Sequence, residues 1–271
     1  MHPIFLRLGP IEIHWYGVCM ATGFLLFLGT WTWLSRGTHR NSNYLSNLLT
    51  VLILSALFGA RAAYVAEHWS AFSPQPWSIL KVNEGGLMFY GGLLSAWIAL
   101  SIFARFHKER WLDFMDLIVT AVPVGHAVGR IGCFLEGCCF GDRCNSALGV
   151  HYPVGSHLWA HQVNEGMIGL TDVPLPVYPS QLFESFANFV IYGILLWHYR
   201  RRRKEGEQVA LYALLYAPVR YVVEIFRSDV RMSVGPFTIS QAISLAIFIF
   251  GVSLALYLHR CGRPVDTTTE A

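Results

Sequence analysis

Four long stretches of this chain contain no Asp, Glu, Lys or Arg, and they constrain its fold more than any other feature: Ile13–Ser35, Asn41–Ala60, Gly85–Ala104 and Met232–His259. Each is long enough to cross the ~30 Å hydrocarbon layer of a membrane as a helix of roughly 20 residues. Charged residues make up 14% of the chain, against about 25% in a typical soluble domain. An ordinary soluble enzyme is therefore excluded. A net charge of +3 gives no support to nucleic-acid binding.

Apolar runs between polar clusters predict an all-α integral membrane protein with about seven transmembrane helices. The fourth contains Pro123 and the sixth contains Pro218, so we expect a kink or break there. We expect one membrane domain over residues 1–260, an external segment at about 132–179, and a disordered cytoplasmic tail at 261–271. Residues 70–84 contain two prolines and are expected to dip into the membrane interface. The seven predicted spans lie near 14–34, 45–69, 86–105, 112–131, 181–199, 208–226 and 237–259.

The distribution of basic residues predicts the orientation, because cytoplasmic loops carry an excess of Lys and Arg. With the N-terminus outside, the outer segments hold 5 of the 20 basic residues, namely Arg7, Lys81, Arg143, Arg227 and Arg231. The inner loops and tail hold 12: Arg36, Arg40, Arg105, Lys108, Arg110, Arg200, Arg201, Arg202, Arg203, Lys204, Arg260 and Arg263. This bias predicts an external N-terminus and a cytoplasmic C-terminus.

The arithmetic 20 − 12 − 5 leaves Arg61, Arg130 and Arg220, all inside predicted spans. An arginine in hydrocarbon costs at least a few kcal/mol, so it marks a functional site by default. A guanidinium offers a planar fork of donors suited to phosphate. Three of them toward the outer leaflet would form an electropositive pocket for lipid headgroups. In the alternative, they snorkel to the interface or form structural ion pairs with nearby carboxylates, namely Glu67, Glu136, Glu184 or Glu224.

Short motifs surround these arginines. Arg130 lies in a glycine-rich segment, Gly129–Gly141, whose glycines allow tight turns and close approach of a ligand. The segment Glu84–Gly92 repeats that chemistry at the third span. Further motifs are Tyr178-Pro179-Ser180-Gln181-Leu182-Phe183-Glu184, Arg220 with Glu224 at i, i+4, and His14-Trp15-Tyr16-Gly17.

In their order and their placement on seven spans, these motifs resemble the prolipoprotein diacylglyceryl transferase family over nearly the whole chain. The resemblance implies transfer of the diacylglyceryl group of phosphatidylglycerol to the lipobox cysteine of a prolipoprotein, where it forms a thioether, with release of glycerol phosphate. It also implies a bacterial plasma membrane, an active site open to the outer leaflet, contact with membrane lipids, and no metal or organic cofactor.

Attack of a thiol on the glyceryl carbon expels a phosphate ester, so the site must stabilise charge on phosphate and remove a proton from sulfur. We expect Arg130 and Arg220 to stabilise the phosphate, with Arg61 as a third candidate. The remaining candidates for binding or orienting the substrate are Tyr16, Glu136, Gly141, Gln181, Glu184 and Glu224.

The chain departs from the familiar family pattern at four positions. Tyr90 replaces a histidine beside the Gly-Gly pair, Cys133 an asparagine, Cys138 a glutamate, and Tyr178 a histidine before Pro-Ser-Gln. These departures leave the general base open between Tyr90, Glu224 and a proton acceptor such as His126; Tyr90 could equally be a packing aromatic. They also allow a divergent subgroup with another lipid or acceptor.

Four of the six cysteines fall within twelve residues, at Cys133, Cys138, Cys139 and Cys144. Three interpretations compete: a disulfide involving Cys144, free thiols in packing roles, and a metal site, for which this spacing is only marginal. Two other functions remain as alternatives to the transferase. One is a transporter or channel whose arginines select anions, and the other is a membrane thiol-redox protein.

Overall fold

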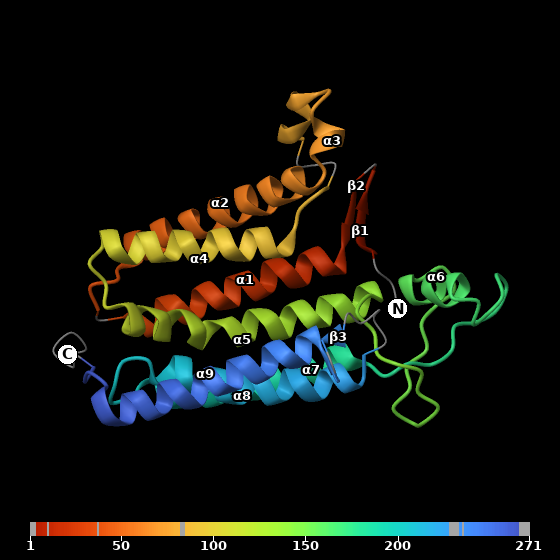
Figure 1. Ribbon diagram of the computed structural model, residues 1–271. Coiled ribbons are helices and arrows are strands. Elements are labelled where there is room, and N and C mark those ends of the chain that lie inside the picture. The colour runs from red at the N-terminus through yellow and green to blue at the C-terminus, as the bar shows by residue number, and fades with distance from the viewer. Residues whose placement is uncertain are drawn as a thin grey trace. The chain divides into compact units, whose positions relative to one another are not determined.

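The computed structural model describes residues 4–9, 11–36, 38–81, 85–227, 233–234 and 236–265, and most of them are helical (Figure 1). Each of the seven predicted spans coincides with a helix. These helices are α1 (Trp15–Leu34), α2 (Ser42–Glu67), α4 (Phe89–Phe106), α5 (Trp111–Glu136), α7 (Ser180–Tyr199), α8 (Glu207–Ile225) and α9 (Ile239–Cys261). Four of them, α1, α2, α5 and α9, are long and apolar enough to cross a membrane.

Side-chain caps define where several helices begin. Asn41 accepts a hydrogen bond from the amide of Tyr44 at the start of α2. Thr238 and Gln241 form a reciprocal capping box that starts α9. Such caps satisfy amide groups that would otherwise be unpaired at a helix N-terminus.

The fold differs from an all-helical chain near the N-terminus and between α8 and α9. Strand β1 (Ile4–Leu8) pairs antiparallel with β2 (Ile11–His14), and the short strands β3 (Ser233–Val234) and β4 (Phe237–Thr238) form a second hairpin. Neither α5 nor α8 is broken at its proline, since Pro123 and Pro218 each lie inside a continuous helix.

The segment between α2 and α4 and the C-terminal tail are both partly ordered. Residues 69–81 include the short helices α3 (Trp69–Phe72) and η1 (Pro76–Leu80), while residues 82–84 lie outside the described part. The expected disordered tail is ordered as far as residue 265. The amide of Glu205 donates to the carbonyl of Arg263, and that of Val265 to the carbonyl of Arg203, both at 3.0 Å. Residues 266–271 lie outside the described part.

The described chain divides into two compact units, one within Thr32–Phe114 and one within Met1–Trp31 and Met115–Val265. The smaller unit is built on α2 and α4, which lie side by side (Figure 1). Gly59 and Gly91 allow this close packing, because a Cβ at either position would overlap Ser95 or Ala63. Small residues at such contacts are typical of membrane helix pairs.

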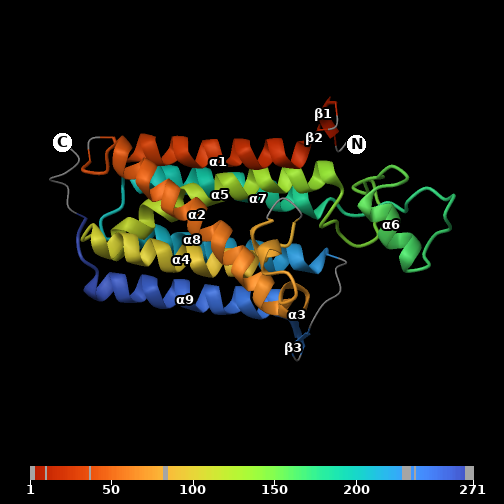
Figure 2. The ribbon, with the colours of Figure 1, turned by 90° about the horizontal axis from the view of Figure 1, so that it is seen from above.

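The larger unit contains α1, α5, α7, α8 and α9, together with the long 137–179 connection and its helix α6 (His157–Asn164). The connection extends beyond the ends of α5 and α7 (Figure 2). It has a small core of its own, formed by Phe140, Tyr152, Leu158 and Val177. Helix α8 packs along α9, and α1 packs on α5 where Gly23 meets Gly125.

A buried carboxylate, Asp116 of α5, caps the N-terminus of α8. It is fully buried and accepts hydrogen bonds from the amides of Gly206, Gln208 and Val209 at 2.8, 3.0 and 3.1 Å. Arg202 lies 3.9 Å away and balances its charge. A negative charge at a helix N-terminus is stabilising because the amide groups there carry partial positive charge.

We expect Asp116→Ala to destabilise the protein by about 3 kcal/mol, since three buried amides and one guanidinium lose their partner. Thermal unfolding in detergent micelles measures the loss. Asp172→Ala is the control, because this exposed loop carboxylate accepts only one amide bond, from Gly169, and its loss should cost about 0.5 kcal/mol or less. Equal melting temperatures for the two variants would contradict the capping role.

Candidate active site

The centre of the larger unit holds a buried ion pair between α5 and α7. Nε of Arg130 lies 3.0 Å from one carboxylate oxygen of Glu184, and Nη2 donates to the other oxygen at 3.3 Å. His126, one turn before Arg130, places Nε2 3.1 Å from the same carboxylate. Glu184 is 1% exposed. This two-point contact fixes the plane of the guanidinium, and His126 bonds to a carboxylate rather than to a helix carbonyl.

A second ion pair lies within α8. Nη2 of Arg220 is 2.9 Å from a carboxylate oxygen of Glu224, as the i, i+4 spacing predicts, and 3.2 Å from the hydroxyl of Ser240. The other oxygen of Glu224 accepts from the Thr238 hydroxyl at 3.2 Å. Nη1 of Arg220 is buried and has no hydrogen-bond partner among the described residues. Arg220 therefore keeps one donor for a further ligand.

Helix α8 brings the two ion pairs into one electrostatic environment through residues that the sequence analysis missed. Tyr216 lies close enough to Arg130, Arg220 and Glu184 to interact with their charges, and its ring packs near that of His126, 5.7 Å between centroids. Tyr212 stacks on Tyr216. The missed signal is a four-residue spacing of polar and aromatic side chains in α8, Tyr212, Tyr216 and Arg220, in which each residue lies beside the next one.

The N-terminus of α7 fixes the chain that follows α5. The side-chain amide of Gln181 donates, through Nε2, to the carbonyl of Cys138 at 2.8 Å and to the hydroxyl of Tyr152 at 3.3 Å. The hydroxyl of Ser180 donates to the carbonyl of Cys139 at 3.2 Å. Burial raises the pKa of Tyr152 to about 12, so its hydroxyl stays protonated at neutral pH. Gln181 thus holds the loop beside the ion pair.

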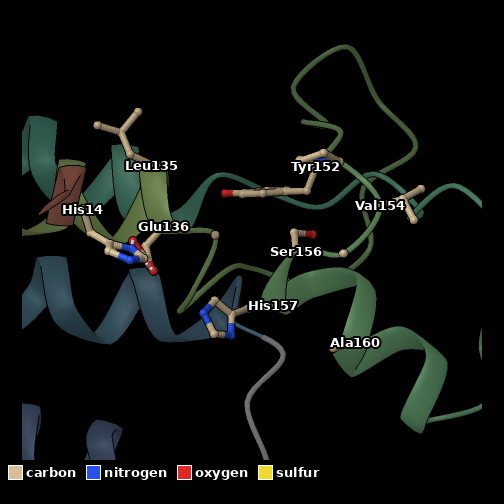
Figure 3. Close-up of a pocket in the computed structure, with 11 residues that line it drawn as sticks. His14, Leu135, Glu136, Tyr152, Val154, Ser156, His157 and Ala160 are labelled. Atoms are coloured by element: carbon tan, nitrogen blue, oxygen red, sulfur yellow. Dashed lines mark hydrogen bonds and ion pairs between the residues drawn. The ribbon is translucent and has the colours of Figure 1, made fainter. Parts of the chain in front are cut away.

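Glu136 lies at the end of α5 and lines a pocket of about 380 Å³ (Figure 3). Its carboxylate is 3.2 Å from Nδ1 of His14, and the opposite wall is formed by the connection, including Tyr152, Ser156 and His157. The ion pairs of Arg130 and Arg220 do not line this pocket. Tyr16 of α1 has its ring against Gly132 and lies within electrostatic range of Arg130.

Gly141 joins the connection to the end of α8. Its amide donates to the carbonyl of Tyr178 at 2.9 Å, and it forms an antiparallel bridge with Arg227. A Cβ at this position would lie 2.5 Å from the carbonyl oxygen of Phe226 and 2.7 Å from that of Tyr178. The close backbone approach explains why glycine stands here.

Arg61 and Tyr90 belong to the smaller unit. The Arg61 guanidinium is buried and donates to the carbonyls of five residues, Ser78, Ile79, Lys81, Gly85 and Gly86, at 2.7–3.2 Å. It thus holds the segment between α2 and α4, a contact that the sequence did not indicate. Tyr90, at the start of α4, is 72% exposed.

All six cysteines are free thiols. One of the three interpretations of the cysteines, a disulfide at Cys144, is not formed; this thiol is buried and lies 3.1 Å from the hydroxyl of Ser146. Cys133, Cys138 and Cys139 form a cluster whose sulfur atoms all lie within 4.8 Å of one another. This arrangement favours the metal-site interpretation, for which the spacing alone was only marginal.

Apolar helices that enclose two arginine–carboxylate pairs are typical of a membrane protein. Comparison with known proteins is more specific. A family model for prolipoprotein diacylglyceryl transferase matches residues 3–257. The chain belongs to this family.

Named relatives agree with the family model. The chain is similar to phosphatidylglycerol–prolipoprotein diacylglyceryl transferase 2 of Clostridium perfringens, with 29% identity over 90% of each chain. It is 31% identical to the phosphatidylglycerol–prolipoprotein diacylglyceryl transferase of Legionella pneumophila, over 94% of this chain and 96% of the relative. The enzyme of that name from Coxiella burnetii is also 31% identical, over 92% of each chain.

We expect Gly141→Ala to destabilise the junction of the connection with α8, because the new methyl group would collide with two backbone carbonyls that cannot rotate away. Limited proteolysis should cut the 137–179 connection at least several-fold faster. Gly193→Ala is the matched control, since no atom outside its own helix lies within 4 Å of a Cβ there, and Ala favours a helix over Gly. Unchanged proteolysis of Gly141→Ala would contradict this interpretation.

Proposed function

We propose that the protein transfers the diacylglyceryl group of phosphatidylglycerol to the lipobox cysteine thiol of prolipoproteins, forming a thioether and releasing glycerol phosphate. The observation that carries this proposal is the pair of arginines buried in α5 and α8, each held by a carboxylate, in a chain of this family. Relatives of about 30% identity over most of their length are named for this reaction.

The chemistry needs positive charge at the leaving phosphate. Arg130 and Arg220 supply it, and because Glu184 and Glu224 position them before substrate arrives, little reorganisation is needed in the transition state. Nη1 of Arg220 supplies a donor without a partner among the described residues. Tyr16, Glu136 and Gln181 are proposed to contact the headgroup or acceptor, directly or through the loop, and Gly141 to shape that loop. Arg61 contributes by fixing its own loop.

We further propose that the chain spans a bacterial plasma membrane seven times, with its N-terminus outside and its C-terminus in the cytoplasm. The 12 to 5 distribution of basic residues supports this orientation. It places the connection outside and opens the arginine site to the outer leaflet, where phosphatidylglycerol and the prolipoprotein signal peptide meet.

Replacing Arg130 with Ala should lower diacylglyceryl transfer by at least about 10²–10³-fold, because one preorganised donor set for the phosphate is lost. Arg130→Lys keeps the charge but loses the planar fork, so its rate should fall between those of wild type and Arg130→Ala. The measurement is the mass gain of a lipobox peptide incubated with enzyme and phosphatidylglycerol in detergent.

Arg201→Ala is the matched control, since this exposed arginine follows α7 and donates to the carbonyl of Trp197 in that helix. Thermal unfolding of each variant separates lost chemistry from lost folding. Full transfer by a folded Arg130→Ala enzyme would sink the assignment, and so would failure of the wild-type protein to complement a strain depleted of its own transferase.

Tyr90 is one of the candidates for the proton-transfer group, and Tyr90→Phe tests this role by removing only the hydroxyl. We expect transfer to fall at least about 10²-fold if the hydroxyl carries the proton. Tyr257→Phe is the control, because Tyr257 is also exposed, on α9. Activity that survives in Tyr90→Phe would assign Tyr90 to packing or to the membrane interface.

A further inference from the structure

Three thiols cluster beside the arginine site at the end of α5. The sulfur atoms of Cys133, Cys138 and Cys139 lie within 4.8 Å of one another, and all three residues are partly buried. None of these three thiols forms a disulfide. The cluster lies within electrostatic range of Arg130 and Tyr16, so it belongs to the same region as the phosphate-binding arginines.

The end of α5 explains why residues five apart meet. The amides of Gly137 and Cys138 both donate to the carbonyl of Cys133, at 3.0 and 3.1 Å, and the amide of Gly137 also approaches the carbonyl of Phe134 at 3.3 Å. Gly137 has φ +81°. This is the Schellman ending of a helix, which folds the residue after the glycine back over the last turn. Cys133 and Cys138 occupy the two positions that contact each other in such an ending.

Cys139 joins them through an unusual backbone conformation. Its φ is +59°, a left-handed value that is uncommon for residues other than glycine, asparagine and aspartate, and costs about 1 kcal/mol. The carbonyls of Cys138 and Cys139 are held by Gln181 and Ser180 at the start of α7. The surrounding structure therefore maintains a strained turn that brings a third sulfur to the cluster, and such strain is typical of functional sites.

Two arginines lie within electrostatic range of the cluster. The positive charges of Arg130 and Arg227 act on the Cys139 thiol, and that of Arg130 also acts on Cys133. Thiolate is the form that binds metals. Three thiolates around a divalent ion leave one negative charge, which the two arginines are placed to balance.

We propose that Cys133, Cys138 and Cys139 bind Zn²⁺ and that the open fourth position takes the acceptor cysteine of the prolipoprotein. The inference rests on the proposed transferase function. Three protein ligands plus one open position is the arrangement of catalytic zinc sites, and soft thiolate ligands select zinc among the common divalent ions. Zinc–sulfur bonds of ~2.3 Å place ligand sulfurs about 3.8 Å apart, so contraction by about 1 Å completes the site.

The zinc site would supply the proton removal that the sequence leaves open. The acceptor thiol binds the metal and gives its proton to a zinc-bound hydroxide, which leaves as water, since a coordinating thiol is deprotonated. The thiolate sulfur then forms the bond to the glyceryl carbon, the carbon–oxygen bond breaks, and its electron pair leaves with glycerol phosphate. The uncharged thioether is a poorer ligand than a thiolate and dissociates. Water refills the position and releases one proton to the solvent, which restores the hydroxide.

The test begins with metal content. The full-length protein, purified in detergent with excess Zn²⁺ and dialysed against metal-free buffer, should retain about one zinc per chain by elemental analysis. Cys133→Ser and Cys139→Ser should retain at least ten-fold less. Cys261→Ser is the matched control, because this exposed free thiol ends α9 away from the cluster, and it should retain the wild-type amount.

Cobalt replacement tests the open position without relying on activity. Co²⁺ bound to the wild-type protein should show thiolate charge-transfer absorption, and that absorption should rise when a lipobox peptide is added. A peptide with serine in place of its cysteine should leave the spectrum unchanged. Loss of the absorption in Cys139→Ser would tie the spectrum to the cluster.

The outcomes separate the inference from the proposed function. If wild-type enzyme makes thioether product but holds no zinc, or if Cys133→Ser and Cys139→Ser keep the full rate, the zinc site is overturned and the transferase stands. A disulfide between two of the three cysteines, seen as a mass two hydrogens lower without reductant, also overturns it. If the zinc-loaded protein makes no thioether product, the transferase function fails instead.

Discussion

An ionised side chain buried among apolar helices must have a partner, and the larger unit depends on this rule. Glu184 is almost fully buried, and removing Arg130 would leave its charge uncompensated, at a cost of about 3–5 kcal/mol. The same pairing therefore joins α5 to α7 and holds a guanidinium in a fixed plane. Asp116, near the start of α5, is likewise buried with partners: three backbone amides at the N-terminus of α8 donate to its carboxylate.

The positions of the helices could be predicted from sequence, but the partners of their charges could not. A run without charge predicts a helix locally, and all seven predicted spans coincide with helices. Glu184 lies 54 positions after Arg130, so their contact depends on how two helices pack, which no local pattern encodes. Arg220 and Glu224 share one helix, and there the i, i+4 spacing was sufficient. The partners of Arg61 could not be predicted from the sequence, because they are backbone carbonyls, which carry no sequence signature.

The thiol cluster lies between these two cases. Spacing rules for zinc sites, which favour pairs separated by two to four residues, gave a marginal signal. Those rules do not include a helix that ends in a Schellman motif. Gly137, at φ +81°, reverses the chain between Cys133 and Cys138. A glycine directly before the second cysteine was therefore the available clue, whereas the left-handed conformation of Cys139 had none.

The departures of this chain from the familiar family pattern form a connected set. The position of a familiar histidine is occupied by Tyr90, which is 72% exposed. Glu224 is engaged by Arg220 and Thr238, and His126 by Glu184. Glu224 and His126 thus both have a structural role. The positions that depart toward cysteine are the ones that the end of α5 brings together, and a metal held there would deprotonate the acceptor thiol directly. A base lost in one helix is then replaced by Lewis-acid chemistry at another, while the arginines keep their task at the phosphate.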